Sequence, residues 1–466
     1  EGRRPTAYAQ RSRRYAVVTM DLRDLPSIDS LASTMSSAFD RIPRPVVVAV
    51  CRGSLDRARV EIASGADADP GADARSRLAD IDAARPRTVI NATGVLLHTN
   101  LGRASMPETA ARHLAEFATA PGNVEIDLRT GRRARRNDYL GALLPSATGA
   151  QAGFAVNNNA GALLLALASV AGEGGRVAVS RGELIEIGGS FRLPELMRAS
   201  GATLVEVGTT NRTRPSDYAA VADSVDAILK VHPSNYRIEG FQEEAPHAAL
   251  AELSRAHGIP FIFDVGSGLV DEEAPWLGDS PRGWLAGEPG VAQAVSAGAD
   301  LVLFSGDKLF GGPQAGVIVG TDEAVERAKR HPIARAVRLD GGTIAALAET
   351  VEMYLDKRVL EIPFWAMASA STDMIERRSV EVCDRVEGFE IEDGGSIPGA
   401  GSVPGVTIPT RVVRLPGNAD DVWSSLAQAP IPVVATRRDG AVYLDLRSVP
   451  PELDGMVAAA VRTATS

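Results

Sequence analysis

The chain has 466 residues, of which 45% are hydrophobic, 23% charged and 5% aromatic, and its formal net charge at pH 7 is −10. This length predicts two or three domains. The lack of any apolar run near 18 residues argues against a membrane protein. The negative charge argues against broad nonspecific nucleic-acid binding. Its two cysteines, Cys51 and Cys383, are far apart and near no histidine cluster, which excludes a disulfide framework or metal site and favours a reducing, cytoplasmic location.

The N-terminal segment "RSRRYAVVTM" begins like a twin-arginine export signal. Asp21, Arg23 and Asp24 interrupt it before an apolar region develops, so the resemblance to a signal ends there. We therefore expect residues 1–19 to form a disordered leader, and Met20 is a candidate start of the native protein.

A small helical domain is predicted over residues 20–65. Helix-like periodicity is interrupted at Pro43 and Pro45, and Asp29 or Ser30 is a candidate cap of the first helix. The next stretch is rich in small and acidic residues and contains proline, as linkers and loosely packed connecting helices are. We assign residues 66–87 to a linker.

From 88 to 345 short apolar strands alternate with amphipathic helices such as 160–171 and 244–257. This alternation predicts an α/β domain with a mainly parallel sheet. Six strand candidates turn abruptly polar: "GFAVNNN", "RVAVSRGE", "TLVEVGTTN", "AILKVHPSN", "PFIFDVGSG" and "LVLFSGDK". Ligands of parallel sheets bind beyond the carboxyl ends of the strands, so these polar tails are predicted to gather at one ligand-binding edge.

A smaller α+β domain is predicted over residues 346–466. The helical stretch "TIAALAETVEMYL" leads to shorter strand candidates, "TRVVRL" and "AVYLDLRSV", and a Gly/Pro-rich stretch, "DGGSIPGAGSVPG", lies between. The whole chain is thus expected to have three folded parts.

Lysine is scarce, with only four among 49 basic residues: Lys230, Lys308, Lys329 and Lys357. A Schiff-base lysine must lie in a pocket that desolvates its amine. Lys329 and Lys357 lie in charge-rich helical surroundings typical of a surface, and Lys230 is interior to a strand and can point to either face. Lys308 alone follows a strand end, among glycines that let the backbone approach a bound ring. Reading "SGDK" as a β-lactamase nucleophile motif lacks the partner elements S-D-N and K-T-G.

Two side chains are candidates for contacting a pyridoxal phosphate ring. Asp264, at the end of "PFIFD", can keep a pyridine nitrogen protonated so that the ring accepts the electrons of a Cα carbanion; an aspartate there also suits a turn cap. His232, where its strand turns polar, can cover a ring face or be a loop histidine without a ligand.

The phosphate of such a cofactor needs donors at a helix start. Asn157, Asn158 and Asn159 precede an apolar helix, and Ser305 lies three residues before Lys308. An Asn-rich turn is also a common helix cap. Together with an aspartate and a lysine in this chain order, the set predicts a pyridoxal phosphate site.

Seven motifs carry a resemblance to a known family: "INATGVLLHTNLGRA", "VNNNAGALLLAL", "SRGELIEIGGSFRLPE", "VGTTNRT", "KVHPSNYRIEGF", "DVGSGL" and "FSGDKLFGGPQAG". With these the chain resembles bacterial selenocysteine synthases, the L-seryl-tRNA(Sec) selenium transferases, from about Leu25 to Leu453 and most densely between 88 and 340. The resemblance implies a fold type I pyridoxal phosphate enzyme that converts seryl-tRNA(Sec) to selenocysteinyl-tRNA(Sec).

The implied reaction consists of Cα deprotonation, β-elimination of water and addition of selenium from selenophosphate to an aminoacrylyl intermediate. Lys308 and Asp264 take the catalytic roles, and Asp307 occupies a family position implicated in catalysis, although it also suits a turn. The family's anion-binding arginines correspond to Arg103 and to Arg335 and Arg338, which share a face if their segment is helical.

The resemblance also implies that the N-terminal domain binds the tRNA and that the protein is a homo-oligomer, a ring of five dimers. The basic loop "LRTGRRARR" then contacts cofactor, partner subunit or RNA, or is a solvated loop. Two other functions stay open: a related lyase that acts by β-elimination on a small amino acid or amino sugar phosphate without tRNA, and a tRNA-binding protein without catalysis.

Overall fold

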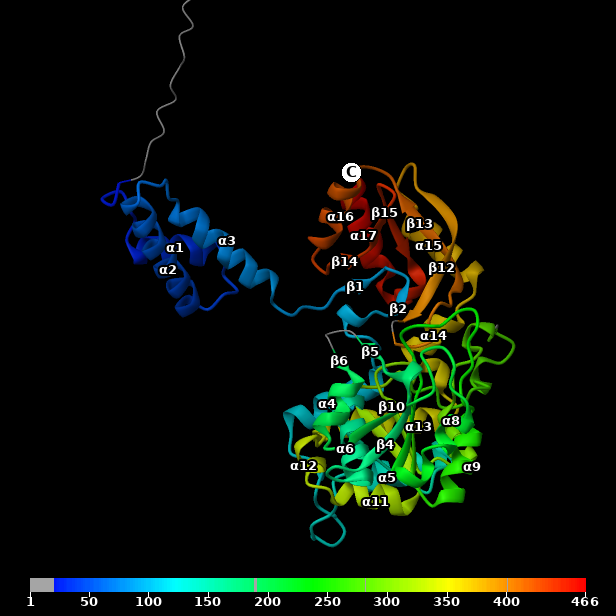
Figure 1. Cartoon of the computed structure of the whole chain (residues 1–466). Coiled ribbons are helices and arrows are strands. Elements are labelled where there is room, and N and C mark those ends of the chain that lie inside the picture. The colour runs from blue at the N-terminus through cyan, green and yellow to red at the C-terminus, as the bar shows by residue number, and fades with distance from the viewer. Residues whose placement is uncertain (1–20, 188–190, 281, 400) are drawn as a thin grey trace, which may run out of the picture. The chain divides into compact units, whose positions relative to one another are not determined.

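The computed structural model describes residues 21–187, 191–280, 282–399 and 401–466. Its described residues divide into two compact units, the first ending at Thr88 and the second covering Val89–Ser466 (Figure 1). The leader predicted over residues 1–19 lies outside the described residues.

From residue 21 onward the first unit contains three helices, α1 Ile28–Ala38, α2 Arg44–Ala63 and α3 Pro70–Ala83. The hydroxyl of Ser27 accepts the Ser30 N–H at 3.1 Å and caps α1, so the expected cap at Asp29 or Ser30 is wrong. Part of the segment expected to be a linker is helix α3, whose Ala74 and Leu78 are buried in a common core with residues of α1 and α2. Burial of apolar side chains at helical spacing makes α3 part of this unit.

The second unit is built on a seven-stranded sheet of order β3-β11-β10-β9-β8-β4-β7. The strand bounds are Ala152–Val156 (β3), Gly316–Gly320 (β11), Leu301–Ser305 (β10), Phe261–Gly266 (β9), Ala227–Val231 (β8), Arg176–Ser180 (β4) and Thr203–Val207 (β7). The sheet is parallel except for β11, which is antiparallel to both neighbours. The predicted mainly parallel α/β sheet is therefore confirmed, and β11 is the strand that the sequence pattern did not reveal.

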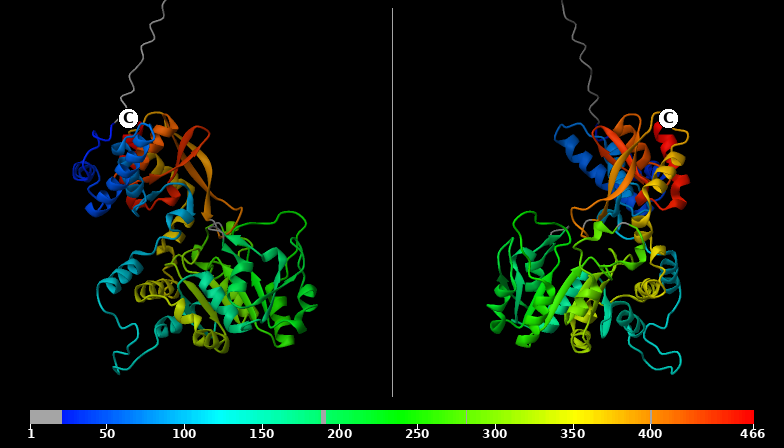
Figure 2. Two further views of the ribbon diagram at one scale, coloured as in Figure 1. Left: turned by 60° about the vertical axis from the view of Figure 1, so that its left-hand side comes forward. Right: turned by 90° about the vertical axis from the view of Figure 1, so that its right-hand side faces the viewer.

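Helices cover both faces of this sheet, as Figures 1 and 2 show. Strand β10 illustrates why: Val302 and Phe304 lie in one hydrophobic cluster, and Leu301 and Leu303 lie in another. The first cluster includes residues of α5 Asp138–Thr148, α9 His247–His257, α10 Val291–Ala297 and α13 Gly341–Leu355. The second includes residues of α6 Asn159–Ala171, α7 Leu193–Ala199 and α11 Asp322–Arg330. Strands that are buried on both faces read as continuous apolar runs, which is why their sequences are so recognisable.

The C-terminal part contains a five-stranded sheet of order β15-β16-β13-β12-β2. The strands are Thr436–Arg438 (β15), Ala441–Asp445 (β16), Ile408–Leu415 (β13), Glu390–Gly399 (β12) and Val95–Leu97 (β2). Its helices are α15 Thr372–Val382, α16 Ala419–Ala427 and α17 Asp454–Thr465. The strand pair β12–β13, orange in Figure 2, extends toward the large sheet.

The boundaries between the two parts of this unit differ from the predicted ones. Strands β1 Ile90–Asn91 and β2 pair with β14 Val433–Val434 and β12, so the start of the expected catalytic domain belongs to the C-terminal part. Helix α13 lies in the core of the large sheet and crosses the expected boundary at 346. Apolar surface has to be covered by whichever chain segment reaches it, and sequence order does not determine which segment does.

Besides short 3-10 turns, the described ranges also contain α4 Glu108–Thr119, α8 Pro215–Ala219, α12 Ile333–Ala336, α14 Pro363–Ser369, β5 Glu186–Ile187 and β6 Phe191–Arg192. Across the described ranges, no helix is both long enough and apolar enough to cross a membrane.

Candidate active site

The carboxyl ends of β9 and β10 bring the predicted aspartate and lysine together. Leu303 of β10 is paired in register with Asp264 of β9, and the chain reaches Lys308 three residues after β10 ends. One cavity at this edge is lined by six of the predicted site residues: Arg103, Asn158, Asn159, Asp264, Ser305 and Lys308. The ligand-binding edge inferred from the polar strand tails is therefore a real cavity.

Lys308 is buried, with 6% of its surface exposed. Burial lowers the pKa of its amine, the charge of Arg103 lowers it further, and the carboxylates of Asp264, Asp307 and Glu288 oppose this shift. Among the described residues no ion pair reaches the Lys308 amine. A lowered pKa gives the amine a larger neutral fraction, which is the form that acts as nucleophile or base.

Asp264 is held by a neighbour from helix α6. Its Oδ1 accepts a hydrogen bond from the Asn159 side-chain amide at 2.9 Å. Burial raises the pKa of this carboxyl to about 6, against the opposing effects of the Asn159 hydrogen bond and the Lys308 charge. A buried carboxylate of this kind gains stability from a cationic partner such as a protonated pyridine nitrogen.

The three asparagines do different things. Asn158 caps α6 by accepting the Gly161 N–H at 2.8 Å, and the side chain of Asn159 donates to Asp264. Asn157 is exposed and is not among the residues that line the cavity, and its backbone N–H donates to Val337. Successive residues at a helix start point roughly 100° apart, so a run of three need not face one ligand as the sequence suggested.

A polar chain connects Arg103, Asp307 and Ser305. Arg103 Nη1 lies 3.1 Å from Asp307 Oδ2, and the Ser305 hydroxyl donates to Asp307 Oδ1 at 2.6 Å. Arg103 has a left-handed backbone, with φ 63°, directly after Gly102 at φ 95°. The structure thus uses Asp307 to hold an arginine at the cavity wall.

His232 lies beside the cavity. Its backbone N–H donates to the carbonyl of Asp264 at 2.9 Å, but its imidazole Nε2 lies 3.2 Å from Glu288 Oε2. Its side chain is not among those that line the Lys308 cavity. The ring-covering role of His232 stays a prediction, and its imidazole is paired with a buried glutamate that the sequence analysis did not single out.

Arg335 and Arg338 are exposed and are not among the residues that line the cavity. Helix α12 is only four residues long and ends at Ala336, so the expected common helix face does not form. Arg338 Nη1 donates to Glu125 Oε1 at 3.3 Å, and its backbone bridges to Val156.

The glycines around Lys308 serve backbone packing more than ring access. A Cβ on Gly306 would lie 2.6 Å from the Pro313 carbonyl, and one on Gly268 would lie 2.6 Å from the Ser305 carbonyl. Gly266, at φ 70°, would place a Cβ no closer than 3.7 Å to any atom. Close approach of chain to chain therefore explains Gly306 and Gly268, and of these three glycines Gly266 is the one with space beside it.

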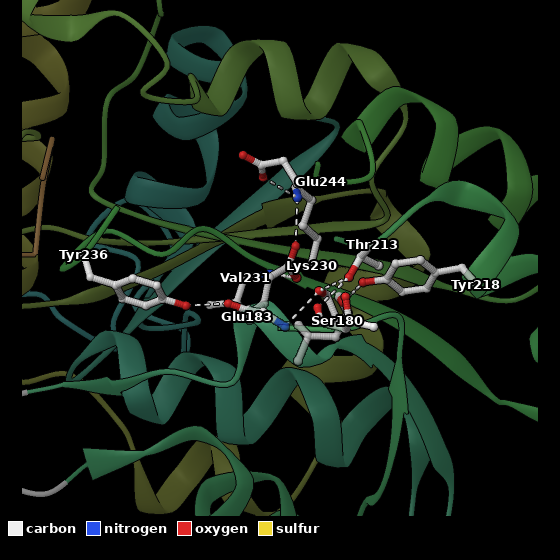
Figure 3. A network of polar contacts seen from close by, with 11 residues as sticks. Ser180, Glu183, Thr213, Tyr218, Lys230, Val231, Tyr236 and Glu244 are labelled. Carbon is white, nitrogen blue, oxygen red and sulfur yellow. Dashed lines mark hydrogen bonds and ion pairs between the residues drawn. The ribbon is translucent and has the colours of Figure 1, made fainter. Parts of the chain in front are cut away.

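The second buried lysine, Lys230, belongs to a separate network (Figure 3). Its amine lies 2.8 Å from Glu183 and 3.1 Å from Glu244, and the other oxygen of Glu183 accepts the Val231 N–H at 2.9 Å. Burial alone lowers the pKa of Lys230, but the charges of Glu183 and Glu244 outweigh burial and raise it. Lys230 therefore stays protonated and paired, which the strand sequence alone left open.

The residues of the cavity fit pyridoxal phosphate. The Lys308 amine has no ion-pair partner in the described part of the chain, and Asp264 is a buried acid with a raised pKa. One buried polar atom of a cavity-lining residue, Asn159 Oδ1, has no hydrogen-bond partner in the described residues. The 13-residue helix α6 begins at the cavity. The free backbone N–H groups of its first turn face the cavity, and such a helix start favours an anionic group. Together the fold and this site define a fold type I pyridoxal-phosphate-dependent enzyme.

Comparison with known proteins agrees. A solved structure described as D-glucosaminate-6-phosphate ammonia-lyase matches with a TM-score of 0.57 at 20% identity, covering 82% of this chain and 96% of that chain, which supports the fold. The family model "L-seryl-tRNA selenium transferase" matches residues 89–450, and "Selenocysteine synthase N terminal" matches residues 22–59. The chain belongs to the L-seryl-tRNA selenium transferase family, and its cofactor is pyridoxal phosphate.

Two curated relatives illustrate the match, and both are named L-seryl-tRNA(Sec) selenium transferase. The protein of Geotalea uraniireducens (strain Rf4) is 40% identical over 450 residues, which cover 92% of this chain and 96% of the relative. The protein of Moorella thermoacetica is 41% identical over 450 residues, which cover 92% of this chain and 94% of the relative. The resemblance inferred from the motifs is thereby confirmed.

Proposed function

We propose that the chain converts L-seryl-tRNA(Sec) to L-selenocysteinyl-tRNA(Sec) with selenophosphate as the selenium donor. The observation that carries this proposal is the cavity containing Lys308 and Asp264, in a chain whose family matches cover the N-terminal unit as well as the catalytic part. A lyase acting on a small molecule has no need of the N-terminal unit. The comparisons give that alternative no support beyond the shared fold.

Bound pyridoxal phosphate supplies the electron sink that makes removal of a Cα proton possible. The side chains divide the remaining work. Lys308, with its lowered pKa, takes the proton from Cα of the seryl group, and this proton and the Cβ hydroxyl leave as water. Selenophosphate then bonds to Cβ through selenium, the donor's proton reaches Cα by way of Lys308, and hydrolysis of the P–Se bond releases phosphate. Asp264 holds positive charge at the pyridine nitrogen, and Asn159 fixes the orientation of its carboxylate.

Selenophosphate is a small polyanion and needs fixed cations. Arg103 supplies one at the cavity wall, where Asp307 holds it. We assign Arg335 and Arg338 to the same anion, supported by their match to the family's anion-binding arginines. Both side chains are exposed in the single chain, and reaching the anion requires Arg338 to leave Glu125.

We further propose that the N-terminal unit binds the tRNA, that the protein works as a homo-oligomer, a ring of five dimers, and that the reaction takes place in the cytoplasm. The match of residues 22–59 to the selenocysteine synthase N-terminal model supports the first point. The family resemblance supports the oligomer, and the need for a supply of charged tRNA supports the location.

The direct test is to incubate purified full-length protein with seryl-tRNA(Sec) and selenophosphate or thiophosphate and to identify the amino acid released from the tRNA by mass spectrometry. We expect selenocysteine or cysteine, and none with Lys308→Ala. Seryl-tRNA(Ser) is the matched control substrate. No product from seryl-tRNA(Sec), together with β-elimination from a free amino acid, would favour the small-molecule lyase instead.

A further inference from the structure

Glu288 is a buried acid outside the lysine cavity, with 1% of its side chain exposed. Its Oε2 lies 3.2 Å from His232 Nε2 and accepts the backbone N–H of Val403 at 3.1 Å. Its Oε1 is buried and has no hydrogen-bond partner among the described residues. One carboxylate therefore connects the end of β8 in the large sheet with a loop of the C-terminal part.

The loop that Glu288 holds covers the reactive lysine. A Cβ on Gly401 would lie 3.1 Å from the Lys308 amine, so the backbone of this glycine lies against Nζ. Ser402 and Val403 are buried, and Val403 also lines the neighbouring cavity beside His232 and Glu288. The position of residues 401–405 therefore determines how much space lies next to the Lys308 amine.

The conformation of this loop needs support from outside. Val403 has φ 48°, in the left-handed region, where a β-branched residue is a genuine outlier. Such strained residues persist only where the surrounding structure over-determines them. The hydrogen bond from the Val403 N–H to Glu288 is a contact of that kind, and the glycines at 401 and 405, at φ 87° and 75°, let the chain turn on either side.

We propose that Glu288 is a positioning residue of the active site. It holds the 401–405 loop against Lys308, and it also fixes the imidazole of His232 beside the end of β8. Glu288 acts through these two groups and takes no part in bond making. The proposal rests on the proposed function only in giving Lys308 the reactive role, because the geometry itself involves neither tRNA nor selenium donor.

The test compares Glu288→Ala and Glu288→Gln in the full-length, cofactor-loaded protein. Hydrogen–deuterium exchange is followed in peptides that cover residues 401–407, and pyridoxal phosphate release is followed by its absorbance. Glu288→Ala should speed exchange at 403 and its neighbours by about tenfold or more and speed cofactor release. Glu288→Gln, which keeps an oxygen acceptor for the Val403 N–H, should recover most of the protection. Glu273→Gln, an exposed acid on the same stretch of chain, should change neither.

Turnover separates positioning from mere stability. With seryl-tRNA(Sec), Glu288→Ala should lower kcat and leave KM within about twofold, because the N-terminal unit, which we propose binds the tRNA, is unchanged. Unchanged exchange at 401–407 in folded Glu288→Ala would overturn the proposal, as would equal acceleration throughout the protein. If Glu288→Ala does not fold, His232→Ala provides the test, since it spares the bond to Val403 and should leave the loop protected. Loss of loop protection in His232→Ala contradicts the direct role of Glu288. None of these exchange results depends on whether the proposed reaction is correct.

Discussion

The chain contains two buried lysines whose surroundings make them opposites. Lys230 lies within β8, paired at 2.8 Å with Glu183 and at 3.1 Å with Glu244, and its pKa is raised. Lys308 lies beyond β10, has no ion pair within the described residues, and its pKa is lowered by burial and by Arg103. Burial is common to both. The arrangement of nearby charges decides which amine is structural and which can react.

Removing each lysine in turn tests this contrast most strongly. Lys308→Ala should abolish the absorbance of the lysine-bound cofactor and reduce turnover by about a thousandfold or more, since it removes both the covalent anchor and the proton-transfer group. Lys230→Met should keep the cofactor absorbance in the folded protein. Visible absorption spectra and single-turnover assays measure both. If the cofactor absorbance remains in Lys308→Ala and is lost in Lys230→Met, then Lys230 is the reactive lysine and Lys308 the structural one.

For the free energy of unfolding we expect Lys230→Met to have a larger effect than Lys308→Ala. Lys230→Met leaves Glu183 buried without its cation and should lower the free energy of unfolding by about 3–5 kcal/mol. The double variant Lys230→Met/Glu183→Gln should recover part of this loss, because it removes the uncompensated charge. Urea unfolding of the two variants and of Glu183→Gln measures the coupling. Purely additive losses would show that the pair does not act as a unit.

The pH dependence of the cofactor-free protein tests the carboxylate that accompanies Lys308. The pKa of Asp264 is raised from 3.8 to about 6, so between these values the folded protein binds more protons than the unfolded chain and loses stability as pH rises. Above pH 6 the ionised, buried carboxylate costs up to about 3 kcal/mol. Asp264→Asn should therefore make the cofactor-free protein more stable at pH 8, with the gain shrinking as pH falls from 6 to 4. Denaturant unfolding across this range measures the gain, and a gain independent of pH would contradict the shift.

The smallest effect concerns the amide that orients Asp264. Asn159→Ala removes the 2.9 Å hydrogen bond to the carboxylate and should weaken pyridoxal phosphate binding by about tenfold, the equivalent of about 1.5 kcal/mol. Asn157→Ala is the matched control, because this exposed neighbour is not among the cavity-lining residues and should leave affinity unchanged. Titration of cofactor-free protein with pyridoxal phosphate measures both. Equal losses in the two variants would indicate a general effect on the turn.

Local pattern was sufficient for six of the seven strands of the large sheet and for the main chemical pair, but it missed β11 and read part of α3 as linker. All six strand candidates that end in polar residues form strands of the large sheet, and the cavity at the ends of β3, β8, β9 and β10 contains Asp264 and Lys308. Pattern was insufficient where a side chain had a choice of partners. His232 pairs with Glu288, and Arg338 pairs with Glu125, 213 residues away along the chain. Contacts of that kind leave no periodicity in the sequence.

Apolar runs and abrupt polar ends indicate a parallel sheet because both of its faces must be covered, and the scarcity of lysine left few candidates for the reactive amine. These properties are local, so they can be recognised from the sequence alone. The opposite states of Lys230 and Lys308, and the position of the 401–405 loop over the reactive amine, arise only when distant segments meet. Electrostatic energy depends on distances in space, so only the folded chain determines which lysine is paired with carboxylates and which has the lowered pKa.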